Sequence, residues 1–223
     1  SGEVVGAIGM TEPGAGSDLQ SMRSSAILQG DHYLLNGSKT FISNGQHADL
    51  VVLAAKTDPQ ARAKGVSLLL VDTHLDGFKK GTNLEKIGLH SQDTSELFYD
   101  NVKVPKEQLL GQAGQGFAYL MQELPRERTA IAATAIGAIR GSIDVTIQYV
   151  KERQAFGQPI SQFQNTRFVI AQAKIDELAT AAFYNQNVEL YMQGKLDVET
   201  AAALKSFSTD MQMKIADNLL QLF

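Results

Sequence analysis

The sequence contains no cysteine, and its only histidines are His32, His47, His74 and His90. The absence of cysteine excludes disulfides, thiolate metal ligands and cysteine nucleophiles. The histidines show neither the HxxxH nor the HExxH spacing of a helical zinc site. We therefore expect no metal centre, and no hydrolase that depends on a serine–histidine or cysteine–histidine pair.

A large excess of one charge and long hydrophobic runs are also lacking. Twenty Lys and Arg residues stand against 24 Asp and Glu residues, and the net charge of −4 offers no broad cationic field for nucleic acid. The longest nearly apolar run, Thr129 to Ile139, is shorter than the ~20 residues that cross a bilayer. We expect a soluble globular protein without an integral membrane segment. Because the chain begins at Ser1 and stops at Phe223 inside a helical pattern, we expect it to be part of a longer protein.

Residues 1–112 carry the signals of a β-domain. Short runs rich in β-branched residues are separated by turn residues, and no segment of helical length lies between them. The pair Asn36-Gly37 is the strongest short hairpin signal, and Asn44-Gly45 indicates a second turn. An antiparallel barrel or sandwich is therefore favoured over a doubly wound α/β domain. The expected strands are Val4–Met10, Ser24–Gln29, Tyr33–Ser43, Leu50–Lys56, Gly65–Asp72 and Glu96–Val104.

Residues 113–223 predict an incomplete bundle of antiparallel helices, which makes the chain an α+β protein. Helices are expected over 115–123, 126–153, 160–193 and 197–223, with Asp197 as the N-cap of the last. Apolar residues recur at helical spacing in two of them. They are Ile131, Ala135, Ala138, Ile139, Ser142 and Val145, and then Phe168, Ala171, Ile175, Leu178 and Ala182. Three long helices leave one apolar face without a partner, so we expect a fourth helix or another subunit to cover it.

The loop from Thr11 to Asp18 is the first segment with the composition of a binding site. Its small residues would let backbone N–H groups and the hydroxyls of Thr11 and Ser17 approach a phosphate. It contains no GK[ST] sequence, and its glycine spacing is GxGxxL rather than GxGxxG, so a P-loop or Rossmann site is not indicated. Taken alone, the loop also fits a sharp turn rich in Pro and Gly.

Five further motifs follow this loop along the chain. After Thr11-Glu12-Pro13-Gly14-Ala15-Gly16-Ser17-Asp18, the chain carries Lys39-Thr40-Phe41-Ile42-Ser43-Asn44-Gly45, Leu89-His90-Ser91-Gln92-Asp93-Thr94-Ser95-Glu96-Leu97, Val102-Lys103-Val104-Pro105, Arg126-Glu127-Arg128 and Glu152-Arg153-Gln154-Ala155-Phe156-Gly157. In this order and spacing, the motifs resemble the acyl-CoA dehydrogenase family, and the resemblance covers essentially the whole chain. It implies a flavin-binding middle β-domain over 1–112, most of the C-terminal helical domain over 113–223, and FAD as the cofactor.

The resemblance also implies which residues contact FAD. In the β-domain, Phe41 matches an aromatic that stacks on the flavin, and Ser43 matches a hydroxyl near its N5 atom. Strand alternation would place both on one face, as a planar redox ring requires. Alternatively, Phe41 is a core aromatic and Ser43 bonds the backbone of the following turn. The remaining implied FAD contacts are Ile8, Met10, Thr11, Ser17, Arg153, Phe156, Gln164 and Gln221.

Helix geometry adds an inference about assembly. Glu127 and Arg153 are 26 positions apart, and a straight helix would separate them by about 39 Å. An extended FAD is much shorter, so the two residues would serve different FAD molecules and a subunit would lend Arg153 to its neighbour. This agrees with the homodimers and homotetramers of the family. Alternatively, Arg153 only offsets the negative C-terminus of its helix.

The resemblance implies that Glu127 is the catalytic base. Dehydrogenation of a thioester removes a proton from Cα, which needs a carboxylate in the pocket. Glu127 matches the position used by long-chain and isovaleryl types, while Arg128 and Ser17 match contacts to CoA. Pro125 and Glu127 also fit the first turn of a helix, where Pro has a suitable φ and Glu favours the positive end.

These expectations together predict an FAD-dependent acyl-CoA dehydrogenase. It would form a trans-2-enoyl-CoA and pass electrons to an electron-transfer flavoprotein. The alternatives are an acyl-CoA oxidase-like flavoenzyme on the same fold and a flavin-free assembly module built on the helices. A bacterial cytoplasm is favoured as the compartment, and the mitochondrial matrix also fits the composition.

Overall fold

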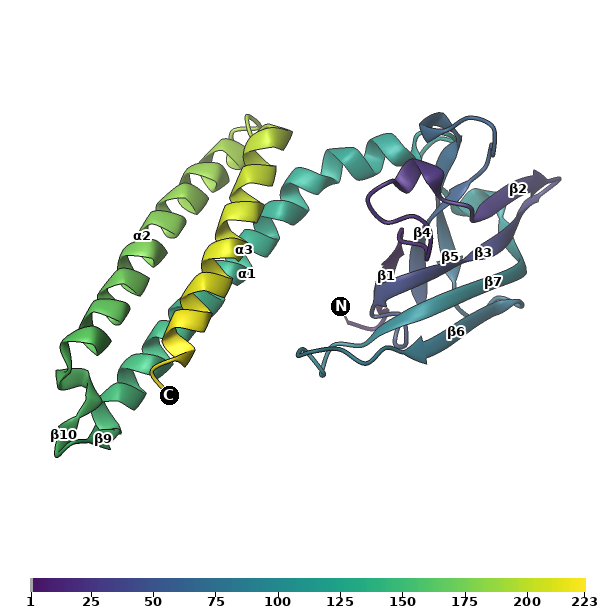
Figure 1. The fold of residues 1–223 in the computed structure, drawn as a ribbon. Helices are drawn as coiled ribbons and strands as arrows, with labels where there is room; N and C mark the ends of the chain where they lie inside the picture. Colours follow the sequence, from purple (N-terminus) through teal and green to yellow (C-terminus); the bar gives the residue numbers. More distant parts are fainter. Residues whose placement is uncertain (1) are drawn as a thin grey trace. The chain divides into compact units, whose positions relative to one another are not determined.

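The computed structural model describes residues 2–223, and the chain divides into two compact units (Figure 1). The first unit extends to Leu120, and the second runs from Met121 to Phe223. The division falls inside one long helix. The sheet-then-helices order confirms the α+β class.

The first unit is built around one eight-stranded sheet. Its strand order is β6-β7-β3-β2-β4-β5-β8, and β1 pairs with β4. Neighbouring strands are mostly antiparallel, but β1 runs parallel to β4, and β2 pairs in parallel with β4 at Ser25 and Lys56, which the sequence did not predict. The strands are β1 (Gly6–Gly9), β2 (Ser25–Gln29), β3 (His32–Ser43), β4 (Leu50–Lys56), β5 (Val66–Asp72), β6 (Phe78–Asn83), β7 (Thr94–Pro105) and β8 (Leu109–Leu110).

The apolar residues of these strands form one continuous core. Strands β4 and β5 are the most buried, since both have buried residues at almost every position. Such strands read as continuous apolar runs rather than as alternating ones. The core includes Ala26, Leu35, Val51, Leu53, Leu69, Val71, Leu97 and Val102, each fully buried.

The expected hairpin at Asn36-Gly37 is wrong. These residues lie inside β3, at a register shift between β3 and β7, and the hairpin turn is formed by Gly30 and Asp31 between β2 and β3. Gly37 has a φ of +144°, and a Cβ there would lie 2.7 Å from the Cα of Ser24. The glycine is therefore explained by a bulge and a close backbone approach. The turn at Asn44-Gly45 is confirmed, because β3 ends at Ser43.

The helical unit contains all but the first turn of α1 (Gly116–Glu152), together with α2 (Gln164–Met192) and α3 (Val198–Leu220). The small hairpin β9 (Gln154–Ala155) and β10 (Gln158–Pro159) lies between α1 and α2. The predicted break between residues 123 and 126 is wrong, because α1 is continuous and contains Pro125. Proline lacks a backbone N–H, so the carbonyl of Met121 loses its usual partner there while the helix continues. Asp197 is confirmed as an N-cap, since its side chain accepts a hydrogen bond from the Thr200 N–H at 2.6 Å.

The apolar face predicted for α2 is not the face that packs against α1 and α3. Phe168, Ile175 and Leu178 are all more than half exposed. The buried residues of this helix are instead small or polar, and they are Thr166, Ala173, Glu177, Thr180, Ala181 and Asn187. Ion pairs and hydrogen bonds satisfy part of this polar face, as described below for Glu177. The sequence pattern therefore marked the outer face of the helix.

Helix α1 is long and apolar enough, by length and composition, to cross a membrane, and it is the one such helix among residues 2–223. The sequence did not predict this. Core helices of soluble proteins pass the same test, and Ala132, Ala135, Ile139 and Ile143 of α1 are buried within the chain itself. We therefore interpret α1 as a bundle helix.

Candidate functional site

Apart from Ser17, the residues expected to contact FAD in the β-domain lie on two neighbouring segments, residues 8–11 and 41–43. The N–H of Thr40 donates to the carbonyl of Thr11 at 2.9 Å. At the other end, Asn44 Nδ2 donates to the carbonyl of Gly6 at 3.1 Å. These two bonds place the segment with Phe41 and Ser43 beside the segment with Ile8 and Met10.

Phe41 occupies a bulge at the edge of this region. The pairing of β3 with β7 shifts between Lys39 and Ile42, and Phe41 has a φ of +58°. A bulge of this kind turns a side chain away from the regular alternation. The Phe41 side chain is 66 % exposed, whereas Thr40 and Ile42 on either side are buried. Ser43 is also exposed. The alternative that Phe41 is a core aromatic is therefore wrong.

The loop after β1 contains a tight turn around Pro13-Gly14. Glu12 and Ala15 exchange both backbone hydrogen bonds, at 3.0 and 3.1 Å. This confirms the turn that the composition allowed, and it leaves Ser17 exposed beyond it. Thr11 is partly buried, and its carbonyl is occupied by Thr40.

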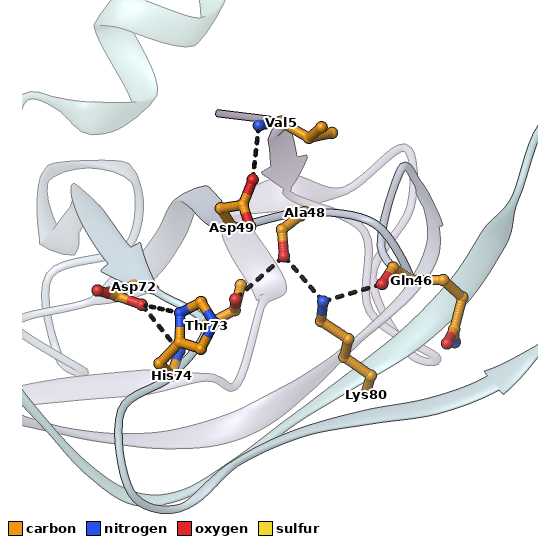
Figure 2. A network of polar contacts seen from close by, with 8 residues as sticks. All are labelled: Val5, Gln46, Ala48, Asp49, Asp72, Thr73, His74 and Lys80. Carbon is orange, nitrogen blue, oxygen red and sulfur yellow. Dashed lines mark hydrogen bonds and ion pairs between the residues drawn. The ribbon is translucent and has the colours of Figure 1, made fainter. Parts of the chain in front are cut away.

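A second network holds the start of β1 and the turn after β3 (Figure 2). The Asp49 carboxylate accepts a hydrogen bond from the Val5 N–H at 2.8 Å. Lys80 of β6 donates to the carbonyls of Gln46 and Ala48 at 2.9 and 2.8 Å. Strand β6 was not predicted, yet its lysine fixes the turn that follows the candidate flavin residue Ser43.

The structure also shows a buried ion pair beneath these segments that the sequence analysis did not predict. Lys39 Nζ lies 2.8 Å from Glu12 Oε1, and both side chains are buried. Both residues stand inside the quoted motifs, each within two positions of Thr11 or Phe41. The available signal was Lys39 itself, a charged residue that strand alternation places on the same face as Tyr33 and Leu35.

In the helical unit, four predicted FAD contacts gather at one end. Arg153 follows α1 directly and donates its N–H to the carbonyl of Tyr149. Phe156 lies at the tip of the β9–β10 hairpin, is 95 % exposed, and contacts Phe163 edge to face at 6.1 Å. Gln164 begins α2, one residue after Phe163.

Gln221 joins this group through the end of α3. Tyr149 stacks on Phe223 with ring centroids 4.2 Å apart, and its hydroxyl donates to the Phe223 carbonyl at 3.1 Å. Gln221, the C-cap of α3, therefore lies at the same end of the unit as Arg153. The structure brings together Arg153, Phe156, Gln164 and Gln221, and all four are exposed.

Glu127 lies near the other end of α1. The sequence suggested that Glu127 lies in the first turn of its helix. This is wrong, because the helix begins at Gly116 and continues through Pro125. The rise of ~1.5 Å per residue separates Glu127 from Glu152 by about 38 Å. Glu127 is exposed, and within residues 2–223 it makes no side-chain hydrogen bond or ion pair. Arg128 is half-buried, and one of its guanidinium nitrogens is buried without a partner in the described part of the chain.

Two family descriptions match this chain. "Acyl-CoA dehydrogenase, middle domain" matches residues 7–102, and "Acyl-CoA dehydrogenase, C-terminal domain" matches residues 114–223. The chain belongs to the acyl-CoA dehydrogenase family. It is therefore a member of a family of FAD-dependent oxidoreductases, as the motifs predicted.

Individual relatives agree with this assignment. The chain is 43 % identical to the mitochondrial long-chain specific acyl-CoA dehydrogenase of Mus musculus, over all of this chain and 52 % of that protein. An acyl-CoA dehydrogenase from Geobacillus kaustophilus superposes with a TM-score of 0.97 at 45 % identity, over 99 % of this chain and 58 % of that one. A glutaryl-CoA dehydrogenase in complex with glutaryl-CoA superposes with a TM-score of 0.94 at 38 % identity, over 99 % of this chain and 56 % of that one. The chain thus spans little more than half the length of these relatives.

Proposed function

We propose that the protein is an FAD-dependent acyl-CoA dehydrogenase, which converts an acyl-CoA thioester into the trans-2-enoyl-CoA and passes the electrons to an electron-transfer flavoprotein. The observation that carries the proposal is the exposed Phe41, held in a bulge beside the Thr11 segment in a chain of this family. A solvent-exposed aromatic beside several hydroxyls is a suitable surface for a planar redox ring.

The residues present fit FAD in two places. In the β-domain, Phe41 offers an apolar face, and Thr11, Ser17 and Ser43 offer hydroxyl groups. At the end of the helical unit, Arg153 offers a cation for the pyrophosphate and Phe156 a second exposed ring. The remaining residues of the proposed site are Ile8, Met10, Gln164 and Gln221. When bound, FAD supplies the acceptor for the hydride that leaves Cβ of the substrate.

Glu127 is the proposed base. Its carboxylate would take the proton from Cα of the thioester, while Arg128 and Ser17 bind the CoA portion. The buried, unpartnered nitrogen of Arg128 is consistent with an anionic partner from outside this chain.

The distance along α1 supports a shared site. Glu127 and Arg153 are too far apart for one FAD to reach both if they belong to the same chain. We therefore propose a homodimer or homotetramer in which Arg153, Phe156, Gln164 and Gln221 serve the flavin of a neighbouring subunit. The exposed apolar side chains Phe168, Ile175 and Leu178 of α2 are consistent with a further partner surface.

Substrate and compartment are proposed at a coarser level. The position of Glu127 and the similarity to a long-chain enzyme favour a long acyl chain. The bacterial cytoplasm is the proposed compartment, with the mitochondrial matrix as the alternative, because relatives come from both bacteria and mitochondria.

The test is anaerobic bleaching of the flavin by acyl-CoA substrates of increasing length. We expect the intact protein to be yellow and to bleach with substrate, and E127Q to keep FAD but not bleach. The matched control is E123Q on the same helix, where Glu123 is exposed and pairs with Arg126 at 3.6 Å. It should bleach like the wild type.

Three outcomes would contradict parts of this proposal. Bleaching retained in E127Q would reject Glu127 as the base. A wild type that retains no flavin in equilibrium dialysis would reject the flavoenzyme itself. Direct formation of peroxide in air would favour the oxidase-like alternative over transfer to a flavoprotein.

A further inference from the structure

Glu12 and Lys39 form a buried ion pair next to the candidate flavin site. The Lys39 side chain is fully buried, and its ammonium group donates to Glu12 Oε1 at 2.8 Å and to the carbonyl of Met10 at 3.0 Å. Well-packed apolar residues often stabilise a core as much as a buried ion pair does, because desolvation of the charges offsets their attraction. Stability alone therefore does not account for two charges at this place.

The Glu12 carboxylate links three segments of the chain. Besides Lys39, it accepts hydrogen bonds from the backbone N–H groups of Arg23 at 2.6 Å and Ser24 at 3.0 Å. Burial raises the pKa of Glu12, but the N–H of Arg23 and the Lys39 ammonium outweigh it, so the net pKa is lowered. The carboxylate is therefore charged at neutral pH, and its bonds hold the loop after β1, the start of β2 and the middle of β3.

These bonds converge next to two residues of the candidate site, Thr11 and Phe41. Glu12 is the neighbour of Thr11, and Lys39 immediately precedes the bulge that contains Phe41. Lys39 and Thr40 are both buried although they are consecutive, and the Thr40 N–H is bonded to the Thr11 carbonyl. The ion pair and this hydrogen bond therefore fix the base of the bulge from two sides.

We propose that Glu12 and Lys39 are positioning residues, which set the orientation of Phe41 and Thr11 toward the isoalloxazine ring. The inference rests on the proposed flavin site. An aromatic residue with a positive φ, such as Phe41, has a strained backbone and keeps this conformation only where its surroundings determine it. The ion pair supplies that constraint. The short distance between Lys39 and Glu12, together with the backbone N–H groups that bind the Glu12 carboxylate, allows one arrangement of the three segments.

The experiment compares E12Q, K39M and the double variant E12Q/K39M in the intact protein. The matched control is K103M/E107Q, which removes one cation and one carboxylate from exposed positions of the same unit. The measurements are the dissociation constant for FAD, the visible absorption and fluorescence of bound flavin, and the urea midpoint of the flavin-free protein. We expect each single variant to weaken FAD binding at least about tenfold and to shift the flavin spectrum, with no change in the control.

The double variant separates positioning from stability, because it leaves no lone buried charge. We expect it to recover most of the urea midpoint but neither the FAD affinity nor the wild-type spectrum. Recovery of all three, or variants that lose stability while the affinity and spectrum stay as in the wild type, would overturn the inference and leave the proposed function intact. A wild type that binds no FAD would overturn both.

Discussion

Replacing Glu177 with glutamine tests whether one buried carboxylate holds two helices of the helical unit together. Glu177 of α2 has only 1 % of its side chain exposed. It accepts a hydrogen bond from Arg140 Nε of α1 at 2.7 Å and one from Lys174 Nζ of α2 at 2.6 Å. E177Q keeps the shape of the side chain and removes its charge, so the packing of the two helices is otherwise unchanged.

The magnitude follows from the exposure of the partners. A hydrogen bond to a charged group contributes about 1.5–3 kcal/mol, so two such bonds set an upper bound of about 6 kcal/mol. Arg140 and Lys174 are, however, 57 % and 55 % exposed, so water screens both bonds and solvates both cations after the change. We expect E177Q to lower the free energy of unfolding by about 2 kcal/mol at neutral pH.

The effect should depend on pH with a definite sign. Hydrogen bonds from Lys174 and Arg140 hold the pKa of Glu177 below its usual range. A lowered pKa stabilises the folded protein above the unfolded value of about 4.3, and this stability is lost as the pH falls through the folded pKa. The difference between wild type and E177Q should therefore be full at neutral pH and shrink below about pH 4.

The assay is urea unfolding followed by far-UV circular dichroism, which reports mainly on the helices. E189Q is the matched control, because Glu189 lies exposed on the same helix. Equal midpoints for E177Q and E189Q at neutral pH would refute the reasoning. A difference between wild type and E177Q that persists unchanged at about pH 3 would refute its electrostatic cause.

Two further substitutions separate the fold from the site. G37A should destabilise the first unit by about 2–3 kcal/mol in urea unfolding, because Gly37 has a φ of +144° and a Cβ there would lie 2.3 Å from Ser24 Oγ. G14A is the control and should leave the stability nearly unchanged, because no atom lies within 4 Å of a Cβ at Gly14. Equal midpoints for the two would contradict the bulge geometry. F156A should change the free energy of unfolding by less than about 0.5 kcal/mol, because the ring is exposed, but should weaken FAD binding about 3–10-fold, the loss expected for one aromatic contact. A destabilised variant with unchanged FAD affinity would show that Phe156 serves the hairpin alone.

The β-domain was largely predictable because its strands are marked by local signals. Turn residues bound most of the runs, and Asn44-Gly45 does end a strand. Asn36-Gly37 misled, since the same dipeptide suits a bulge as well as a hairpin, and only the partner strand decides between them. Strand β6, with the sequence Phe78-Lys79-Lys80-Gly81-Thr82-Asn83, has no apolar alternation, so only its pairing with β7 makes it a strand.

The helical unit shows a different limit. Pro125 predicts a helix boundary, yet α1 continues through it, because the residues on both sides favour a helix and one missing hydrogen bond does not end it. On α2 the apolar periodicity marked the exposed face, while Glu177 and Asn187 are buried. Periodicity identifies the face that needs a partner, but it does not say whether that partner lies in the same chain.

The candidate site residues came from motifs, and the structure adds the physical reason why some of them stand out. Three apolar residues in the described chain have positive φ, namely Phe41, Leu89 and Phe156, and their side chains are 66, 79 and 95 % exposed. Such a backbone conformation costs about 1–3 kcal/mol in a residue other than glycine or asparagine.

Burial within this chain offsets little of that cost, because these side chains bury little surface here. The strain must therefore be maintained by the structure around each residue, namely the buried Lys39 next to the bulge of Phe41 and the paired strands β9 and β10 beside Phe156. Holding these two aromatic rings exposed costs stability. The rings therefore contribute only through a ligand or partner that binds to them. At Phe41 the buried ion pair and the exposed ring are thus two parts of one arrangement, which supports the proposal that the flavin binds there.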